Sequence, residues 1–596
     1  LSTESQFFKI TGQYLLGNHV ITGGFEQESL DVFNIFVQHS RGGEYDYFDD
    51  SFGNPAHCAA LDAQGRFTDP ACGMSGIDRF QLGRPSRIYY GSGGGTNDAN
   101  DAAASFTNDQ NSLYIQDELY FPAQDLSIVF GLRYDWFATS DAPNYNAAFS
   151  EANGVRNDAT IDGVDLLQPR FGFTWGVADN VSLRGGFGLY SGGNPNVWIS
   201  NSYSNDGLTN VQLRLNNFSG TGSVLDGSIP LVGAGMPGFD VPQVLYDIVA
   251  GTTPDNGSTS RLALIDPNFE QPAEWKFAIG ATWDMPWYEI QLDIDYLHTR
   301  TVDSALYVDL SQEIVGETII GQPIYAYNNG RDNFMLTNSN RTAVSDIFSI
   351  VVRKDFDFGL DLMLGYAYTQ AEDVSPMTSS TASSNFSNVA LNDINDPRPA
   401  TSNYEVPHRF TFRGTWGHYF WKDLQTRVSL FGFTKEGQPQ SYVMGSNDLE
   451  GNGFFGRHLL YVPTGLNDGN VIFGDNFDTD AFFAFVQKEG LGSGLLDRNA
   501  QHAKWSTRFD LRVDQEIPFF GQSKGRVFLK VYNLGNLIDD GWGLVNDAQF
   551  FSVQAVNSSL NDDGQYVFEQ FNDRTINNLL ENRSLWTIRL GVEVNF

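Results

Sequence analysis

The sequence predicts an all-β fold, a transmembrane antiparallel β-barrel with long extracellular loops and short periplasmic turns. Apolar and polar residues alternate in many segments, which gives each strand one apolar and one polar face. These segments run about twice the usual strand length of 5–6 residues, long enough to cross a bilayer when tilted. A soluble β-sandwich also alternates, but here the second face carries Arg and Asp instead of a second apolar core.

The strands are expected to follow one another along the whole chain. The clearest apolar rows are Ile128 to Trp136, Phe171 to Trp175, Trp275 to Trp283, Leu362 to Tyr368, Phe410 to Trp416, Phe509 to Val513 and Trp586 to Phe596, read at every second residue. About fifteen spanning strands are expected, and two of them, at residues 19–37 and 288–310, are expected to project beyond the membrane.

Short and long connections alternate between these strands. The short ones are expected at residues 17–18, 121–124, 176–179, 284–286, 356–357, 417–423 and 518–524. The long ones are expected at residues 40–109, 138–166, 191–272, 311–332, 370–405, 437–504 and 534–584. This is the arrangement of outer-membrane barrels, with short periplasmic turns and long extracellular loops. Residues 241–250 and 480–488 are expected to form short helices inside the long loops.

The strand count predicts a barrel larger than this chain. The first and the last strand both run toward the periplasm, so their number is odd, whereas a single-chain bacterial barrel closes with an even number. We therefore expect residues 1–596 to form the C-terminal portion, about fifteen strands, of a barrel of about 22 strands. The first strands, a plug and any regulatory-like β-domain would lie outside this chain, and a signal peptide would have been removed before Leu1.

The composition excludes some functions and indicates a compartment. The 596 residues include 72 acidic and 36 basic ones, a net charge of −36, which excludes a non-specific nucleic-acid binder because such proteins need clustered Lys and Arg. The sequence contains no run of about 18 apolar residues, the length that a membrane-spanning helix needs. The two cysteines, Cys58 and Cys72, share one irregular segment, where a local disulfide is expected in an oxidising compartment, with two free thiols as the alternative.

No motif for catalysis is present. The sequence contains no GxSxG, HExxH or P-loop pattern, so no enzymatic role, catalytic residue or cofactor is expected. Asp475, Asp478 and Asp480 lie within six residues of one another, and Ca²⁺ prefers clustered oxygen ligands. A loop-bound Ca²⁺ is one interpretation of this cluster. A solvated turn is favoured, because the stretch does not match the EF-hand loop.

Arginine residues recur on the polar faces of the predicted strands. They are Arg133, Arg170, Arg184, Arg409, Arg413, Arg508, Arg512, Arg526 and Arg589. Asp135, Asp510, Asp514 and Glu593 lie on the same faces and could form cross-strand ion pairs. The favoured interpretation is a polar lumen lining that contacts a plug and water, and the alternative is a pathway for an anionic or peptide cargo.

Aromatic residues crowd the long connections. Trp198, Tyr203, Phe482, Phe483 and Phe485 are examples. Large aromatic side chains dominate recognition surfaces, so such loops could capture a peptide or protein. Packing within the loops is the alternative.

Four segments together resemble one family of receptors. They are residues 167–175 (LQPRFGFTW), 181–198 (VSLRGGFGLYSGGNPNVW), 505–518 (WSTRFDLRVDQEIP) and 527–536 (VFLKVYNLGN). They resemble the Oar-like branch of TonB-dependent outer-membrane receptors. The resemblance implies a plugged barrel that is energised by the TonB complex through an N-terminal region outside this chain.

The resemblance also implies location, partners and cargo. It implies a Gram-negative outer membrane with lipid and lipopolysaccharide as neighbours, and insertion by the barrel-assembly machinery. Phe596 looks like the terminal signal for that machinery, and a lipid-facing girdle residue is its plainer interpretation. The implied cargo is large, a peptide or protein. A surface-binding or adhesion protein anchored by a barrel, and a passive channel, remain the alternatives.

Overall fold

The computed structural model describes most of the chain. The described residues are 2–48, 75–81, 85, 87–216, 241–253, 261–327, 332–445, 449, 451, 456–519, 523–547, 551–574 and 576–594. Cys58, Cys72 and Phe596 lie outside these ranges.

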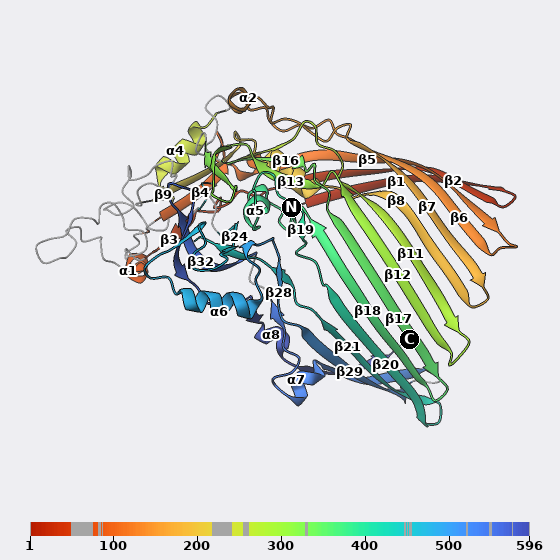
Figure 1. Ribbon diagram of the computed structural model, residues 1–596. Helices are drawn as coiled ribbons and strands as arrows, with labels where there is room; N and C mark the ends of the chain where they lie inside the picture. Colours follow the sequence, from red (N-terminus) through yellow and green to blue (C-terminus); the bar gives the residue numbers. More distant parts are fainter. Residues whose placement is uncertain are drawn as a thin grey trace, which may run out of the picture.

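One antiparallel sheet forms the wall of the molecule, as Figure 1 shows. Fifteen strands pair in chain order along its path, the number predicted from the alternation. They are β1 (Ser2–Leu16), β2 (His19–Asn34), β5 (Ala104–Phe121), β6 (Leu126–Ala138), β7 (Asp165–Ala178), β8 (Val181–Ser191), β11 (Ala273–Met285), β12 (Ile290–Val302), β17 (Val344–Phe356), β18 (Leu360–Asp373), β20 (His408–Trp421), β21 (Leu424–Lys435), β29 (Ser506–Pro518), β30 (Lys524–Tyr532) and β35 (Thr587–Val594). In the described part of the chain β1 pairs only with β2, and β35 only with β30, so the sheet is open.

The cross-strand register gives the sheet one continuous polar face. Directly opposite residues lie on the same face of a sheet, and the register places Thr174 opposite Arg184, Arg184 opposite Gly280, and Gly280 opposite Asp295. Followed from strand to strand in this way, all nine arginines predicted to line the polar faces lie on this one face, which we call the polar face.

The opposite face is apolar and uncovered. Its exposed side chains include Phe8, Ile10, Leu113, Ile115, Phe130, Leu132, Leu167, Phe187, Phe277, Ile279, Leu364, Phe410, Phe509, Leu529, Ile588, Leu590 and Val592. Leu590 is 76% exposed and Leu364 is 53% exposed. An apolar surface of this extent does not occur on a soluble monomer, whereas it is the outer band of a transmembrane barrel.

Aromatic side chains concentrate at both ends of the apolar face. At the turn end Trp283 packs on Trp287, with ring centroids 5.5 Å apart. At the loop end His408 and Trp505 stack at 6.0 Å. Two such levels correspond to the aromatic girdles at the two membrane interfaces.

The connections follow the predicted alternation, with two corrections to the lengths of the strands. The predicted strand at residues 288–310 ends at Val302, because Asp303 adopts a positive φ of 52° that breaks the extended backbone. The following β13 (Ala305–Asp309) belongs to another sheet. Likewise the predicted strand at residues 19–37 ends at Asn34.

The described parts of the long connections fold into packed structures at one end of the wall, which we call the loop crown (the described residues within 35–103, 139–164, 192–272, 303–343, 374–407, 436–505 and 533–586). Its main sheets are β3 (Glu44–Asp46), β4 (Arg87–Gly93) and β9 (Asn210–Asn216); β10 (Leu262–Ile265), β16 (Asn333–Asn338) and β13; and β24 (His458–Leu459), β23 (Tyr442–Met444), β32 (Val553–Leu560), β33 (Tyr566–Phe571) and β26 (Val471–Phe473). The expected helices at residues 241–250 and 480–488 are α4 (Gln243–Gly251) and α6 (Thr479–Glu489).

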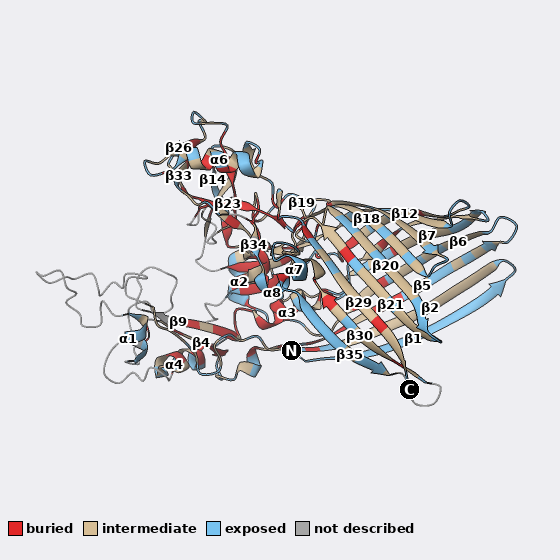
Figure 2. Ribbon diagram, turned by 90° about the horizontal axis from the view of Figure 1, so that it is seen from below, coloured by how far each residue is buried: buried red, intermediate tan, exposed pale blue. Residues whose placement is uncertain are grey.

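Smaller elements complete the crown. They are the strands β14 (Gln312–Glu317), β15 (Pro323–Tyr327), β19 (Ala400–Thr401), β22 (Pro439–Gln440), β25 (Tyr461–Val462), β27 (Gly494–Leu495), β28 (Gln501–His502), β31 (Asn546–Asp547) and β34 (Asn578–Leu579), and the helices α1 (Gly76–Gln81), η2 (Ala99–Ala102), α2 (Ala147–Asn153), α3 (Asn196–Ser204), α5 (Ala382–Ser387), α7 (Leu534–Ile538) and α8 (Glu581–Ser584). Figure 2 shows that buried residues gather in the crown, while the wall is mostly half-buried or exposed. In the described residues no helix is long and apolar enough to cross a membrane.

Candidate functional site

The polar face of the wall is the candidate site, and its first feature is a set of neutralised arginines. On β6 the guanidinium of Arg133 lies 2.8 Å from Asp135 Oδ1 and 3.0 Å from Glu26 Oε2 of β2. Nη1 of Arg133 makes the contact with Glu26, and Nη2 donates a hydrogen bond to Ser112 Oγ at 2.6 Å. Three neighbouring strands thus fix this guanidinium, and both carboxylates balance its charge.

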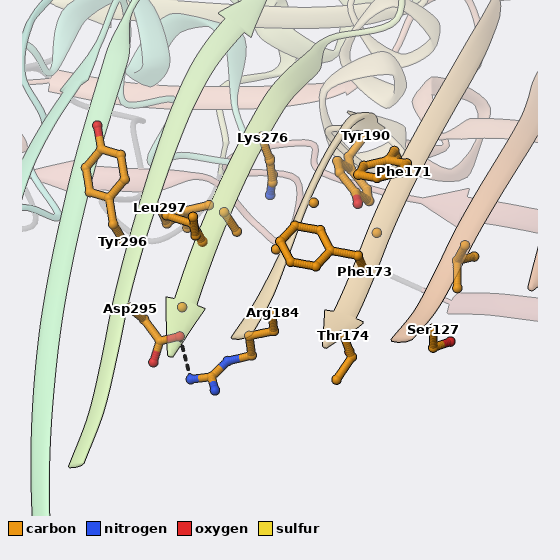
Figure 3. Close-up of a pocket in the computed structure, with 17 residues that line it drawn as sticks. Ser127, Phe171, Phe173, Thr174, Arg184, Tyr190, Lys276, Asp295, Tyr296 and Leu297 are labelled. Carbon is orange, nitrogen blue, oxygen red and sulfur yellow. Dashed lines mark hydrogen bonds and ion pairs between the residues drawn. The ribbon is translucent and has the colours of Figure 1, made fainter. Parts of the chain in front are cut away.

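A second neutralised arginine borders a hollow in the polar face (Figure 3). Arg184 of β8 reaches across β11 to Asp295 of β12, with 2.6 Å between the guanidinium and the carboxylate. Gly280 of β11 lies between them, and a Cβ there would come within 2.1 Å of Asp295 Oδ1. The glycine therefore makes room for the ion pair. The hollow has a volume of about 580 Å³ and is also lined by Tyr190 and Lys276.

A third group of ion pairs lies on the last strands. Arg512 lies 2.5 Å from Asp514 Oδ1 and 3.7 Å from Glu593 Oε2 of β35. Arg526 stands 4.0 Å from both carboxylates. Arg508 donates to Asp510 at 2.9 Å. The sequence suggested cross-strand pairs, and those of Arg512 with Glu593 and of Arg526 with Asp514 are of this kind. The pairs of Arg508 with Asp510 and of Arg512 with Asp514 lie within one strand, which was not expected from the sequence.

Three of the four remaining arginines of the predicted set contact aromatic rings instead of carboxylates, and Arg413 is the fourth. The guanidinium of Arg170 lies 4.6 Å from the centre of the Tyr190 ring, that of Arg409 lies 5.3 Å from Phe433, and that of Arg589 lies 5.2 Å from Tyr532. Such cation–π contacts orient a guanidinium but leave its charge unbalanced. The polar face therefore has balanced and unbalanced regions.

A comparison with protein families decides what this wall is. A family model described as an outer membrane beta barrel domain matches residues 7–539. The chain belongs to this outer membrane β-barrel family. It is therefore a multi-pass protein of the Gram-negative outer membrane. In such a barrel the polar face lines the lumen and the apolar face contacts lipid.

The solved structures that this chain matches include an outer membrane transporter, a siderophore receptor and an iron transporter. The outer membrane transporter YddB from Escherichia coli is 12% identical, with a TM-score of 0.49 over 100% of this chain and 54% of that chain. The siderophore receptor PirA from Acinetobacter baumannii is 11% identical, with a TM-score of 0.39 over 90% and 50%. The FrpB iron transporter from Neisseria meningitidis is 10% identical, with a TM-score of 0.43 over 100% and 56%.

This barrel thus spans about half the length of the solved structures that it resembles. The comparison with curated proteins found no match.

The aromatic residues of the loop crown form its cores. Phe482 is 0% exposed and packs on Phe568 and Phe571 of β33, and Phe485 is 4% exposed and packs on Phe571. Trp198 is half-buried, and its indole nitrogen donates to the carbonyl oxygen of Ser379 at 3.0 Å. Tyr203 is buried beside Phe106, and this burial raises the pKa of its phenol to about 12. Packing is therefore the role of Phe482, Phe485 and Tyr203, and capture of cargo by the loops stays a prediction.

The acidic cluster at residues 475–480 begins a helix. Asp478 is the N-cap of α6, and its carboxylate accepts a hydrogen bond from the backbone nitrogen of Ala481 at 2.9 Å. Within the described ranges no group of three or more His, Cys, Asp or Glu side chains is arranged to hold a metal ion. A Ca²⁺ held by Asp475, Asp478 and Asp480 stays a prediction. The disulfide of Cys58 and Cys72 and the signal at Phe596 fall outside the described residues.

Sequence reasoning missed several partners on the lumen wall. Glu26, Asp295 and Lys435 all lie on it, and none was singled out beforehand. Alternation could have assigned each to the polar face of its own strand. It could not have supplied the register, which decides that Arg184 meets Asp295 while Arg409 meets Lys435.

Proposed function

We propose that this barrel belongs to a TonB-dependent outer-membrane transporter of the Oar-like branch that moves a large cargo, a peptide or protein, across the outer membrane. The width of the wall carries the proposal. Side chains fill a barrel of about eight strands, whereas the largest barrels enclose a channel or a plug. Fifteen strands in one sheet already exceed what their own side chains could fill.

The chemistry of the wall is consistent with transport. Its charged side chains stay hydrated along the lumen and need no apolar partner, as in barrels that conduct polar solutes. The proposal places lipid and lipopolysaccharide against the apolar face. It assigns energy coupling to the TonB complex, insertion to the barrel-assembly machinery, and no enzymatic step or resident cofactor to this chain.

The test is uptake with and without the energy complex. Cells that express the full-length protein would be given a mixture of peptides, and the periplasmic fraction would be analysed by mass spectrometry. We expect peptides to accumulate only when the protein and an intact TonB complex are both present. Accumulation that survives deletion of the complex would identify a passive channel. Peptides bound at the surface but never recovered from the periplasm would identify an anchored surface-binding protein.

A further inference from the structure

Three cations on adjacent strands of the lumen wall have no carboxylate partner among the residues that the structure describes. Arg409 and Arg413 lie on β20, four residues and so about 13 Å apart along the strand. Lys435 lies at the end of β21, directly opposite Arg409 in the register. Like charges that face each other across two strands destabilise a sheet, so folding alone does not favour this pair.

The strands on both sides do not neutralise the three cations. On β18 the residues opposite Arg409 and Arg413 are Ala367 and Met363. On β29 the nearest carboxylate is Asp510, opposite Phe431, and it already binds Arg508 at 2.9 Å and accepts from the Asn533 backbone nitrogen at 2.8 Å. Asp361 of β18 lies one register step deeper, opposite Thr415. In the described residues it forms no ion pair with Arg413.

The guanidinium groups are oriented and accessible. Arg409 lies over the ring of Phe433 at 5.3 Å, which orients its planar fork without cancelling its charge. Both Arg409 and Arg413 are exposed. Arg409 is the second residue of β20, at the end next to the loop crown, so a solute entering from outside meets this level of the wall first.

The charge of the whole chain makes unbalanced cations on this wall unexpected. With a net charge of −36, carboxylates are in excess, and Arg133, Arg184 and Arg512 on the same face each have at least one within 3.0 Å. Cations left unbalanced in an acidic protein create a local positive field that attracts anions. Arginine binds carboxylate and phosphate groups through paired hydrogen bonds.

We propose that Arg409, Arg413 and Lys435 form an anion-binding station on the lumen wall, which receives a carboxylate or phosphate group of the cargo. The inference rests on the proposed function in that cargo enters the lumen, and it adds the chemical class that the cargo carries. The anion first lies between the two strands, where it bridges the like charges of Arg409 and Lys435. Arg413, four residues farther along β20, binds it afterwards.

The test is direct binding to the purified full-length protein, with tripolyphosphate and citrate as probes in calorimetric titrations. The variant Arg409→Gln/Arg413→Gln should bind both probes at least about tenfold more weakly. The control Arg184→Gln/Arg353→Gln removes the same charge from the same face, but from arginines paired with Asp295 and Asp293. It should change affinity by less than about twofold, and Arg409→Lys/Arg413→Lys should retain most of the binding.

Each outcome decides the proposal. Unchanged affinity in the first variant would overturn it, and so would an equal loss in the control, because the effect would then belong to the overall charge of the wall. Binding by the purified protein needs no energy complex, so a failed uptake experiment leaves this result standing. A failed titration likewise leaves TonB-dependent uptake intact.

Discussion

The opposite environments of neighbouring residues on β11 give the sharpest prediction. Ile279 lies at the middle of the strand on the apolar face and is 46% exposed, so its side chain contacts lipid. Arginine at the middle of a lipid-facing strand costs about 2–4 kcal/mol. The variant Ile279→Arg should therefore raise the equilibrium constant for unfolding by roughly 30- to 700-fold. Its neighbour Ala278 faces the lumen beside the hollow of about 580 Å³ and near Asp295. Ala278→Arg should cost less than about 1 kcal/mol, since the new guanidinium stays hydrated.

The assay is guanidinium-induced unfolding of the full-length protein in lipid vesicles, followed by tryptophan fluorescence. Both variants add one arginine to the same strand, one residue apart, so they share the change in net charge and the level of the substitution along the strand. Equal destabilisation by the two substitutions, or a larger loss for Ala278→Arg, would refute the assignment of the two faces.

Three further predictions test individual contacts. Arg512→Gln removes the cation beside the nearly buried Asp514 and should cost about 1–3 kcal/mol in the same unfolding assay. Arg589 contacts only an aromatic ring among the described residues, so Arg589→Gln should cost less. The reverse order would contradict the role of the ion pairs. Phe482→Ala leaves a cavity in the crown core that Phe482 shares with Phe568, and it should cost about 3–5 kcal/mol locally. We expect faster hydrogen exchange in β33 but not in β18. An equal increase in exchange in both strands would argue against a separate core. The hydrogen bond from Arg341 lowers the pKa of the Asp396 carboxyl. The ionised carboxylate therefore stabilises the fold fully above the unfolded pKa of about 3.9, and this stabilisation is lost as pH falls through the lower folded pKa. Protease sensitivity at residues 392–399 should rise below about pH 4, and a pH response that persists in Asp396→Asn would rule this out.

The wall could be predicted from the sequence because alternation is a local signal. Each strand of the wall has 8 to 18 residues, long enough for the period of two to show without knowledge of its partner. The placement of the nine arginines on one face followed from the same parity. Even the helices α4 and α6 had local signals, since Pro242 precedes the first and Asp478 caps the second.

The loop crown could not be predicted in the same way. β23 and β32 pair although more than a hundred residues separate them, and β24 has two residues, too few for any periodicity. Aromatic clusters such as Phe482 and Phe485 have the same composition whether they pack or bind. Burial distinguishes the two roles, and burial depends on those distant pairings. The charge balance of Arg409 also differs from that of Arg184, because the register between strands decides which residues lie opposite each arginine.

The central claim is that lipid contacts one face of this sheet and water the other. Nitroxide labels placed singly at residues 362 to 367 of β18, in a variant without Cys58 and Cys72, measure this directly by their accessibility to oxygen and to a water-soluble nickel reagent. We predict that labels replacing Leu362, Leu364 and Tyr366 meet oxygen, and that labels replacing Met363, Gly365 and Ala367 meet the nickel reagent. Accessibility that does not alternate along these six positions would contradict the account.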